Sequence, residues 1–311
     1  MSRPLRQLGA VVIAAALIIV AIVVRHRIDG DAPSAGSTDA PLHLLCDPLF
    51  RAACEGVAGA TVSVEEPSVT AARLGAESLG ADGWVTSDLW SSIAASRHPE
   101  LAWLAEDKTS VLGTANPILV GQTTKVDALT AACSGTFTWR CVGDHAGQQF
   151  KELKSGLTGK VEIGYPPSTS TTGLATVTAI VSSYLGATDF ASNDLDEPAF
   201  QDWFAKVKAA TVDHGSPNQT PLQSFLVIRA NYGVVGDLST SKPDIASVVD
   251  ASSITATDST PPIRIRAVIV SPGQRDLPAD RLREELAPTW NAEVSAGSLP
   301  SGGVLDALSR L

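Results

Sequence analysis

The chain has 311 residues, 44% of them hydrophobic, and carries 23 Lys and Arg against 33 Asp and Glu, for a net charge of −10. Residues 41–311 hold 19 of the basic and 30 of the acidic residues. This balance argues against a nucleic-acid-binding protein, because no basic stripe is present to neutralise phosphates.

The N-terminal segment contains an unbroken apolar run, Leu8–Val24. At 1.5 Å per residue its 17 residues cover about 25 Å, the low end of what spans a bilayer. A cleaved signal peptide is disfavoured because no A-x-A-like site follows the run. A lipoprotein is disfavoured because the first cysteine, Cys46, comes too late. We therefore expect residues 1–29 to be an uncleaved, single-pass signal-anchor, flanked by Arg3, Arg6, Arg25 and Arg27.

The cysteines form two local pairs, Cys46 with Cys54 and Cys133 with Cys141, each with seven residues between the partners. Four cysteines allow three connectivities, and we expect the local one. Disulfides are favoured over a metal site because no Cys-x-x-Cys motif is present. Disulfides persist in oxidising compartments. Together with the expected signal-anchor, they predict a cell-membrane protein with its C-terminal domain on the extracytoplasmic side.

After a small-residue linker at 30–41, strand and helix patterns alternate with short connections, which predicts an α/β fold with parallel strands covered on both faces. The expected strands are Leu42–Leu45, Thr61–Val64, Trp84–Thr86, Val161–Gly164, Tyr232–Asp237 and Ile263–Val270. Ser110–Val120 is expected to form either one strand or a pair of strands broken at Asn116 and Pro117. One helix is expected to begin at Pro48. The other expected helices are Ser68–Leu79, Leu89–Ala95, Val126–Ala131, Gln148–Ser155, Leu174–Leu185, Glu197–Ala210, Pro278–Leu286 and Val304–Leu311.

A run of five hydroxyl residues and a glycine leads directly into one expected helix. Backbone N–H groups and the positive end of the helix dipole favour an anion there, and hydroxyls add donors. Simple helix capping explains such a run equally well, since one Ser or Thr suffices as an N-cap. The residues of the run are Ser168, Thr169, Ser170, Thr171, Thr172 and Gly173.

Acidic and hydroxyl residues also follow two expected strands. Asp47 follows the first strand, and Ser87 and Asp88 follow the third. Ligands of open α/β sheets bind outside such strand ends, although both aspartates also suit helix capping. Motifs of serine hydrolases, zinc proteases and nucleotide-binding loops are absent, and a nucleophile–base pair of Ser87 with His98 or His145 has no support in the sequence. We therefore expect that the protein is not an enzyme and that it binds neither a cofactor nor a metal ion.

Several short stretches, in this order, resemble elements of the type II periplasmic solute-binding proteins, particularly the molybdate/sulfate-like branch. Gly80–Asp88 resembles a strand end of that family, and Asn116–Val120 resembles a crossover strand. Ile163–Gly173 resembles its hydroxyl-bearing helix start, and Tyr232–Gly236 resembles its return strand.

The resemblance implies two Rossmann-like lobes, 41–120 plus 232–311 and 121–231, with a ligand cleft between them. It implies a tethered extracytoplasmic receptor that binds a small polar ligand or oxyanion, with an ABC permease or another envelope protein as partner. The alternative is a binding-fold module that recognises a protein or cell-envelope partner without transport. By position, the residues facing the ligand would be Asp47, Ser87, Asn116, Ser168, Thr169, Ser170, Thr171, Thr172, Gly173 and Tyr232.

Overall fold

The computed structural model describes residues 41–311, except 155, 215–218, 229–231, 249, 274 and 293–297. The chain divides into two units, Met1–Pro41 and Leu42–Leu311. The expected signal-anchor and almost all of the linker lie outside the described residues. Within the described part of the chain, no helix has both the length and the apolar character of a membrane span.

The first sheet has five strands in the order β2-β1-β3-β9-β4. Its centre is β3, in which all five residues are buried, as expected of a strand covered on both faces. β1 is parallel to β2 and β3, whereas β9 is antiparallel to β3 and β4. The strands are β1 (Leu42–Cys46), β2 (Ala60–Val64), β3 (Gly83–Ser87), β4 (Ser110–Ala115) and β9 (Ile265–Val270).

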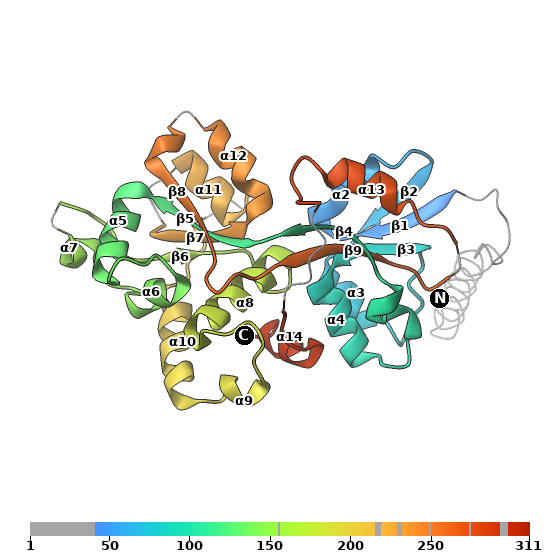
Figure 1. The fold of residues 1–311 in the computed structure, drawn as a ribbon, viewed down its shortest axis with the longest axis horizontal. Coiled ribbons are helices and arrows are strands. Elements are labelled where there is room, and N and C mark those ends of the chain that lie inside the picture. The colour runs from blue at the N-terminus through green and yellow to red at the C-terminus, as the bar shows by residue number, and fades with distance from the viewer. Residues whose placement is uncertain are drawn as a thin grey trace, which may run out of the picture. The chain divides into compact units, whose positions relative to one another are not determined.

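The second sheet has four strands in the order β6-β7-β5-β8, and Asn116 alone separates β4 from β5 (Figure 1). β7 pairs in parallel with β6 and antiparallel with β5, which also pairs with β8. The strands are β5 (Pro117–Gln122), β6 (Ile163–Gly164), β7 (Val234–Leu238) and β8 (Ile254–Asp258).

Sheet membership differs from the division expected from the sequence. That division put residues 232–311 with the first sheet, but β7 and β8 pair within the second. The chain returns to the first sheet only through β9. Because both neighbours of β7 are strands of the second sheet, its hydrogen bonds fix it there.

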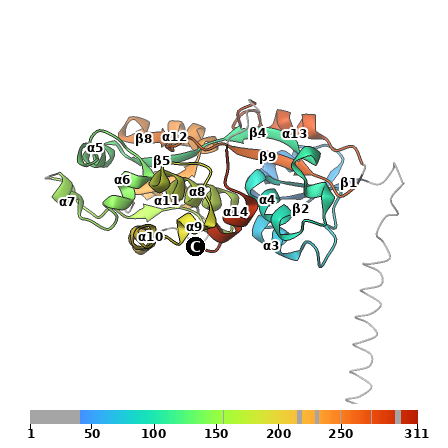
Figure 2. The same cartoon turned by 60° about the horizontal axis from the view of Figure 1, so that its bottom comes forward.

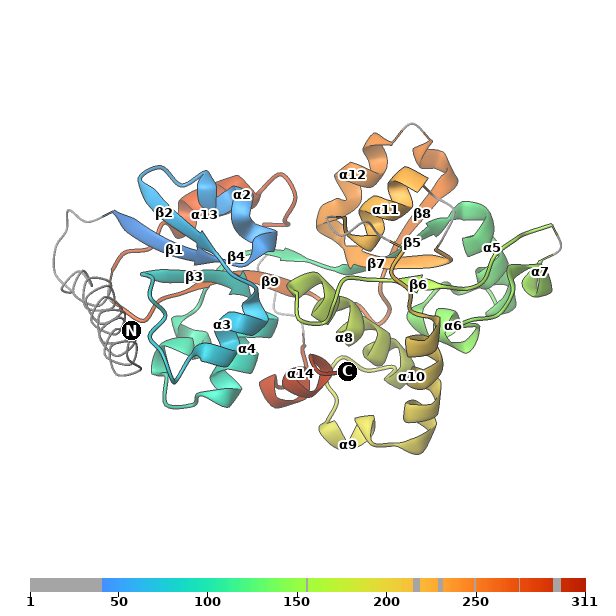
Figure 3. The same ribbon diagram turned by 180° about the vertical axis from the view of Figure 1, so that it is seen from behind.

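Helices cover both faces of each sheet, and the figures show the first sheet with α2, α3, α4 and α13 apart from the second with α5 to α8 and α10 to α12 (Figures 1 and 3). We call these two groups the first and second lobes. The helices are α2 (Arg51–Glu55), α3 (Pro67–Arg73), α4 (Asp88–Arg97), α5 (Thr123–Ala132), α6 (Trp139–Asp144), α7 (Phe150–Leu153), α8 (Thr171–Leu185), α9 (Ser192–Leu195), α10 (Pro198–Ala210), α11 (Pro221–Ile228), α12 (Lys242–Ser247), α13 (Ala279–Leu286) and α14 (Gly302–Leu308). Short 3₁₀ turns are η1 (Pro48–Phe50), η2 (Ala102–Leu104), η3 (Glu106–Lys108), η4 (Ser239–Ser241) and η5 (Ala251–Ser253).

One apolar core is shared by the two lobes. It includes Trp84 of β3, Leu119 of β5 and Leu174 of α8, together with Leu305 and Leu308 of the C-terminal helix. That helix, α14, contacts both α4 and α8 and lies between them (Figures 1 and 2). Smaller separate cores fill the opposite face of each sheet. The lobes are therefore joined by buried apolar surface on the α14 side, in addition to the strand crossovers.

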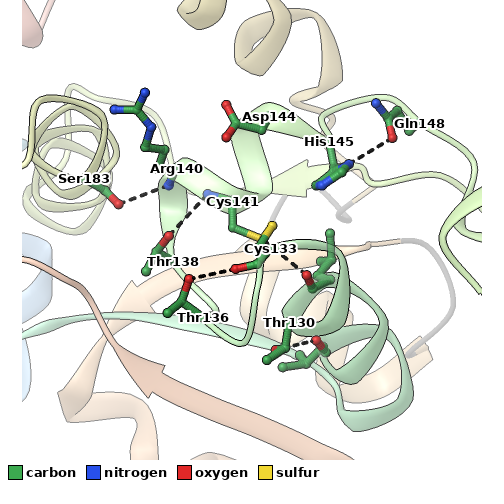
Figure 4. Close-up of a disulfide and its surroundings, with 12 residues drawn as sticks. Thr130, Cys133, Thr136, Thr138, Arg140, Cys141, Asp144, His145, Gln148 and Ser183 are labelled. Atoms are coloured by element: carbon green, nitrogen blue, oxygen red, sulfur yellow. Dashed lines mark hydrogen bonds between the residues drawn. A yellow bond between two sulfur atoms is a disulfide. The ribbon is translucent and has the colours of Figure 1, made fainter.

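The two expected local disulfides, Cys46–Cys54 and Cys133–Cys141, are both confirmed. Figure 4 shows the Cys133–Cys141 disulfide, which links the residue that follows α5 to a residue within α6. Thr138 caps α6 by accepting a hydrogen bond from the Cys141 N–H at 3.2 Å. The Arg140 N–H donates to Ser183 Oγ of α8 at 3.0 Å. The bridge and these hydrogen bonds together fix the short helix α6 between its two longer neighbours.

Candidate functional site

Three of the residues expected to face a ligand meet between the lobes. Asp47 follows β1, Ser87 ends β3, and Thr171 opens α8. The Thr171 hydroxyl donates to Asp47 Oδ2 at 2.5 Å, and Ser87 Oγ lies 3.1 Å from Thr171 Oγ1. Each of the three is at most 2% exposed. These side chains therefore bond to one another across the lobe boundary, and we call them the interlobe cluster.

Asp47 is the ionisable member of the interlobe cluster. Its burial raises its pKa to about 6, because a low-polarity surrounding disfavours the charged form. The hydrogen bonds from Thr171 and from the Leu49 N–H act in the opposite direction. The bond to Leu49 also caps the 3₁₀ turn η1, so Asp47 has the capping role that its sequence position allowed.

The hydroxyl run before α8 is divided among several structural tasks. Ser168 Oγ donates to the Ser309 carbonyl beside α14 at 2.9 Å. Ser170 is the N-cap of α8, and its Oγ accepts from the Gly173 N–H at 3.1 Å. Thr169 is exposed, and Thr171 belongs to the interlobe cluster. Capping and interlobe bonding therefore engage most of the donors that were expected to converge on an anion.

A cavity of about 480 Å³ lies beside the interlobe cluster. Its lining combines Leu49 of the first lobe with residues from the loop before α8 and the start of that helix, from α11 and the residue before it, and from the segment that runs from β7 to the residue after α12. Both volume and lining are of the kind that holds a small organic ligand. The lining residues are Leu49, Pro166, Thr172, Thr220, Leu222, Gln223, Leu226, Val227, Asp237, Ser241, Asp244, Ser247 and Val248.

The cavity contains a buried carboxylate from the second sheet. Asp237 in β7 is 7% exposed. Its Oδ1 accepts from its neighbour's backbone, the Leu238 N–H, at 2.7 Å and from Ser241 Oγ at 2.9 Å. Burial raises the pKa of Asp237 to about 6, and the nearby Asp244 carboxylate adds to that rise. The lining is therefore acidic, with two carboxylates that repel one another.

The lining of the cavity includes the N-terminus of α11, which a reciprocal capping box fixes. The Thr220 N–H donates to Gln223 Oε1 at 3.0 Å, and the Gln223 N–H donates to Thr220 Oγ1 at 3.2 Å. This pair satisfies two backbone donors at the start of the helix. Leu222, Leu226 and Val227 then follow along α11 and give the cavity an apolar wall.

Two other residues expected to face a ligand lie elsewhere. Asn116 connects β4 to β5, and its backbone exchanges hydrogen bonds with Ser239. Tyr232 is fully buried in the core under α11, where its hydroxyl accepts from the His214 N–H at 2.8 Å. Of the ten expected ligand-facing residues, only Thr172 lines the cavity.

Asp237 is not among the residues expected to face a ligand, although its sequence context resembles theirs. Like Asp47 and Asp88, it lies at the carboxyl end of a buried strand and precedes a helical turn. Hydroxyl residues follow it in the stretch Leu238–Ser241. The strand-end rule applied to Asp47 and Asp88 would therefore have selected it as well.

Asp88 has an internal partner. The Arg266 N–H donates to its Oδ1 at 3.0 Å, and Arg266 Nε donates to Oδ2 at 2.9 Å. Arg266 also reaches the exposed Glu106 carboxylate at 2.9 Å. Asp88 is therefore part of an ion pair that fixes α4 to β9 and does not line the cavity.

The two histidines considered as a base for Ser87 have other partners among the described residues. His98 Nδ1 lies 3.3 Å from Glu100, and His145 Nδ1 lies 3.0 Å from Gln148 Oε1, so Ser87 has neither as a base. The described residues also contain no group of three or more His, Cys, Asp or Glu side chains placed to hold a metal ion.

No family model and no curated protein matches this sequence. Solved structures do match. Iron-bound HitA from Pseudomonas aeruginosa is similar at 12% identity and a TM-score of 0.52, over 87% of this chain and 99% of that one. Apo FutA2 from Synechocystis PCC6803 is similar at 11% identity and a TM-score of 0.50, over 87% and 95%. The chain has the mixed α/β fold of the type II periplasmic solute-binding proteins, with no preference for a molybdate/sulfate branch.

Proposed function

We propose that this chain is an extracytoplasmic solute-binding protein that holds a small polar ligand in the cavity beside the interlobe cluster. The observation that carries the proposal is the cavity, because it combines a ligand-sized volume with buried polar groups and apolar walls between two lobes of a solute-binding fold. Residues 1–29 would tether the protein to the membrane, and an ABC permease would be its partner.

The position of the cavity also suits ligand-dependent closure. Leu49 approaches it from the first lobe, while α11 and the β7–α12 turn approach from the second. The shared core and α14 join the lobes on the opposite side of the sheets. A ligand that contacts both walls would favour the closed arrangement, as in hinge closure of other two-lobed binding proteins.

The proposal is tested by isothermal titration calorimetry of the full chain, purified in a mild detergent, against a broad panel. The panel contains molybdate, sulfate and phosphate together with neutral polyols, amines, amino acids and carboxylates. We expect saturable one-to-one binding of one chemical class, weakened by Thr172→Val and unaffected by the exposed Thr169→Val. The absence of binding by every class would overturn the proposal.

A second candidate is a module that recognises a protein or envelope partner. The observation in its favour is that the interlobe cluster fills the space where the family resemblance implied ligand contacts. A shared core beneath both lobes also opposes wide opening. Small-angle scattering with and without the best-binding compound separates the candidates, since only a hinged receptor changes its radius of gyration on binding a small molecule.

A further inference from the structure

The charged groups that line the cavity are both carboxylates. Asp237 and Asp244 lie in its wall, and among the residues that the structure describes no Lys, Arg or His lines it. Lys242 is close in sequence, but its Nζ pairs with Asp258 Oδ1 at 2.9 Å. A ligand in this cavity therefore meets negative charge that none of its described lining residues offsets.

One carboxylate oxygen of Asp237 accepts no hydrogen bond from the part of the chain that the structure describes. The two bonds to Asp237 from the described residues, from Leu238 and Ser241, both end at Oδ1. Oδ2 is left for whatever enters the cavity, in a side chain that is only 7% exposed. A buried carboxylate is costly without a counter-charge, so an entering cation would relieve a cost that an anion or a neutral molecule would not.

The remaining lining gives the ligand a second property. Leu49, Pro166, Leu222, Leu226 and Val248 supply an apolar surface. Val227 also lines the cavity, and at 70% exposed it is one of only two exposed large hydrophobic side chains in the part of the chain that the structure describes. An inorganic cation would leave this surface uncovered, whereas an alkyl or aryl group would bury it.

From these observations we infer that the cavity binds an organic ammonium ion, with the nitrogen at the Asp237 and Asp244 carboxylates and the carbon skeleton against the α11 wall. The inference rests on the proposed function and specifies its ligand class. It replaces the oxyanion expected from the hydroxyl run, because two carboxylates in the wall repel an anion.

The test uses two sets of ligands that share a skeleton and differ in charge. The first is butylammonium, 1-butanol and butyrate, and the second is cyclohexylmethylammonium, cyclohexylmethanol and cyclohexanecarboxylate. Saturation-transfer NMR and calorimetry with the full chain measure binding. We expect the ammonium member of each set to bind at least tenfold more tightly than its alcohol, and the carboxylate to show no binding.

The variant Asp237→Asn keeps an oxygen acceptor for Leu238 and Ser241 but removes the charge. We expect it to weaken ammonium binding at least tenfold, and Asp244→Asn to weaken it severalfold. Asp202→Asn is the matched control, because it removes the same charge from an exposed position on α10. It should leave ammonium binding unchanged. If Asp237→Asn does not fold, Asp244→Asn decides the question, because Asp244 is exposed.

The outcomes separate the ligand class from the function itself. Binding of an alcohol or carboxylate without its ammonium counterpart overturns the ammonium inference and leaves the solute-binding proposal standing. Equal ammonium binding by wild type and both cavity variants also overturns the inference, since the carboxylates would then play no part. Failure of every compound here and in the broad panel overturns both.

Discussion

Thr171 donates its hydroxyl hydrogen to the carboxylate of Asp47, 124 residues away in the sequence. The bond joins the first turn of the longest helix on the second sheet to the end of the first strand of the other sheet. Ser87 adds a second hydroxyl to the same contact. The contact lies beside the cavity, so the polar strand ends of the first lobe hold the lobes together instead of opening toward a ligand.

We predict that Thr171→Val destabilises the protein by about 1–3 kcal/mol, because the buried Asp47 carboxylate loses its side-chain donor. The loss should be larger at pH 8 than at pH 5, since the hydroxyl stabilises the ionised form of Asp47 and lowers its pKa. Urea unfolding of the full chain at both pH values measures the difference. Thr169→Val, an exposed change in the same loop, serves as the control. Equal stability of wild type and Thr171→Val at pH 8 would contradict the role given to this bond.

Stability should also depend on pH through the buried aspartates. Asp47 has a folded-state pKa of about 6 against an ordinary value of 3.8. Between these values the folded state binds more protons than the unfolded state, so this group's contribution to the unfolding free energy decreases as pH rises. The contribution is fully present below pH 3.8 and is lost above about pH 6. For a shift of this size the expected change is about 2–3 kcal/mol between pH 4 and pH 8.

Asp47→Asn isolates that contribution, because the amide does not titrate in this range. We expect the stability of the variant relative to wild type to rise between pH 4 and pH 8. Asp237→Asn should behave alike, since burial raises the pKa of Asp237 to about 6 as well. Asp202→Asn, on the exposed face of α10, should show the wild-type pH profile. Parallel profiles for all four proteins in urea unfolding would refute the shifted pKa values.

The sequence predicted those parts of the fold that depend on local patterns. The alternation of strands and helices gave the α/β class, and the short spacing of each cysteine pair favoured the local bridges that are present. Pairing between distant strands is a tertiary property, so the sheet to which β7 and β8 belong was not visible in their apolar patterns.

The candidate site was harder to predict because a side-chain type does not specify its partner. A hydroxyl such as that of Thr171 can bind a ligand, cap a helix or donate to a carboxylate of the other lobe. In the folded chain its acceptor is the Asp47 carboxylate. Tyr232 was assigned by resemblance, but it packs against the His214 ring at 5.0 Å inside the core. The acidic character of the cavity comes from Asp237 and Asp244, which only the fold places together.

The Cys133–Cys141 bridge gives a further prediction. A cross-link across so short a loop stabilises by about 2–3 kcal/mol in the loop-entropy account. Replacing both cysteines with serine should therefore lower the unfolding free energy by about that amount, measured by urea unfolding. The control is wild type with and without reductant, which should reproduce the loss and add that of Cys46–Cys54. An unchanged midpoint for the double variant would show that the α5–α6 contacts suffice without the bridge.

The last prediction concerns two adjacent glycines at the start of α14. A Cβ on Gly302 would lie 2.1 Å from the Ser92 carbonyl oxygen, a backbone atom of α4 that cannot move aside alone. A Cβ on Gly303 would meet only Ser96 Oγ at 3.6 Å, an ordinary contact. Since α14 joins α4 to α8 beneath both lobes, Gly302→Ala should force the helix away from α4.

We expect Gly302→Ala to destabilise the protein by about 1–3 kcal/mol or more through this overpacking. Gly303→Ala should be neutral or stabilise by up to about 1 kcal/mol, because alanine restricts the unfolded chain and favours the helix. Thermal and urea unfolding compare the two variants, and hydrogen exchange in α14 and α4 reports local separation. Equal stabilities for the two variants would mean that α14 is not packed closely enough on α4 to couple the lobes. A selective loss in Gly302→Ala, with faster exchange in both helices, would establish the close packing that keeps the lobes joined opposite the cavity.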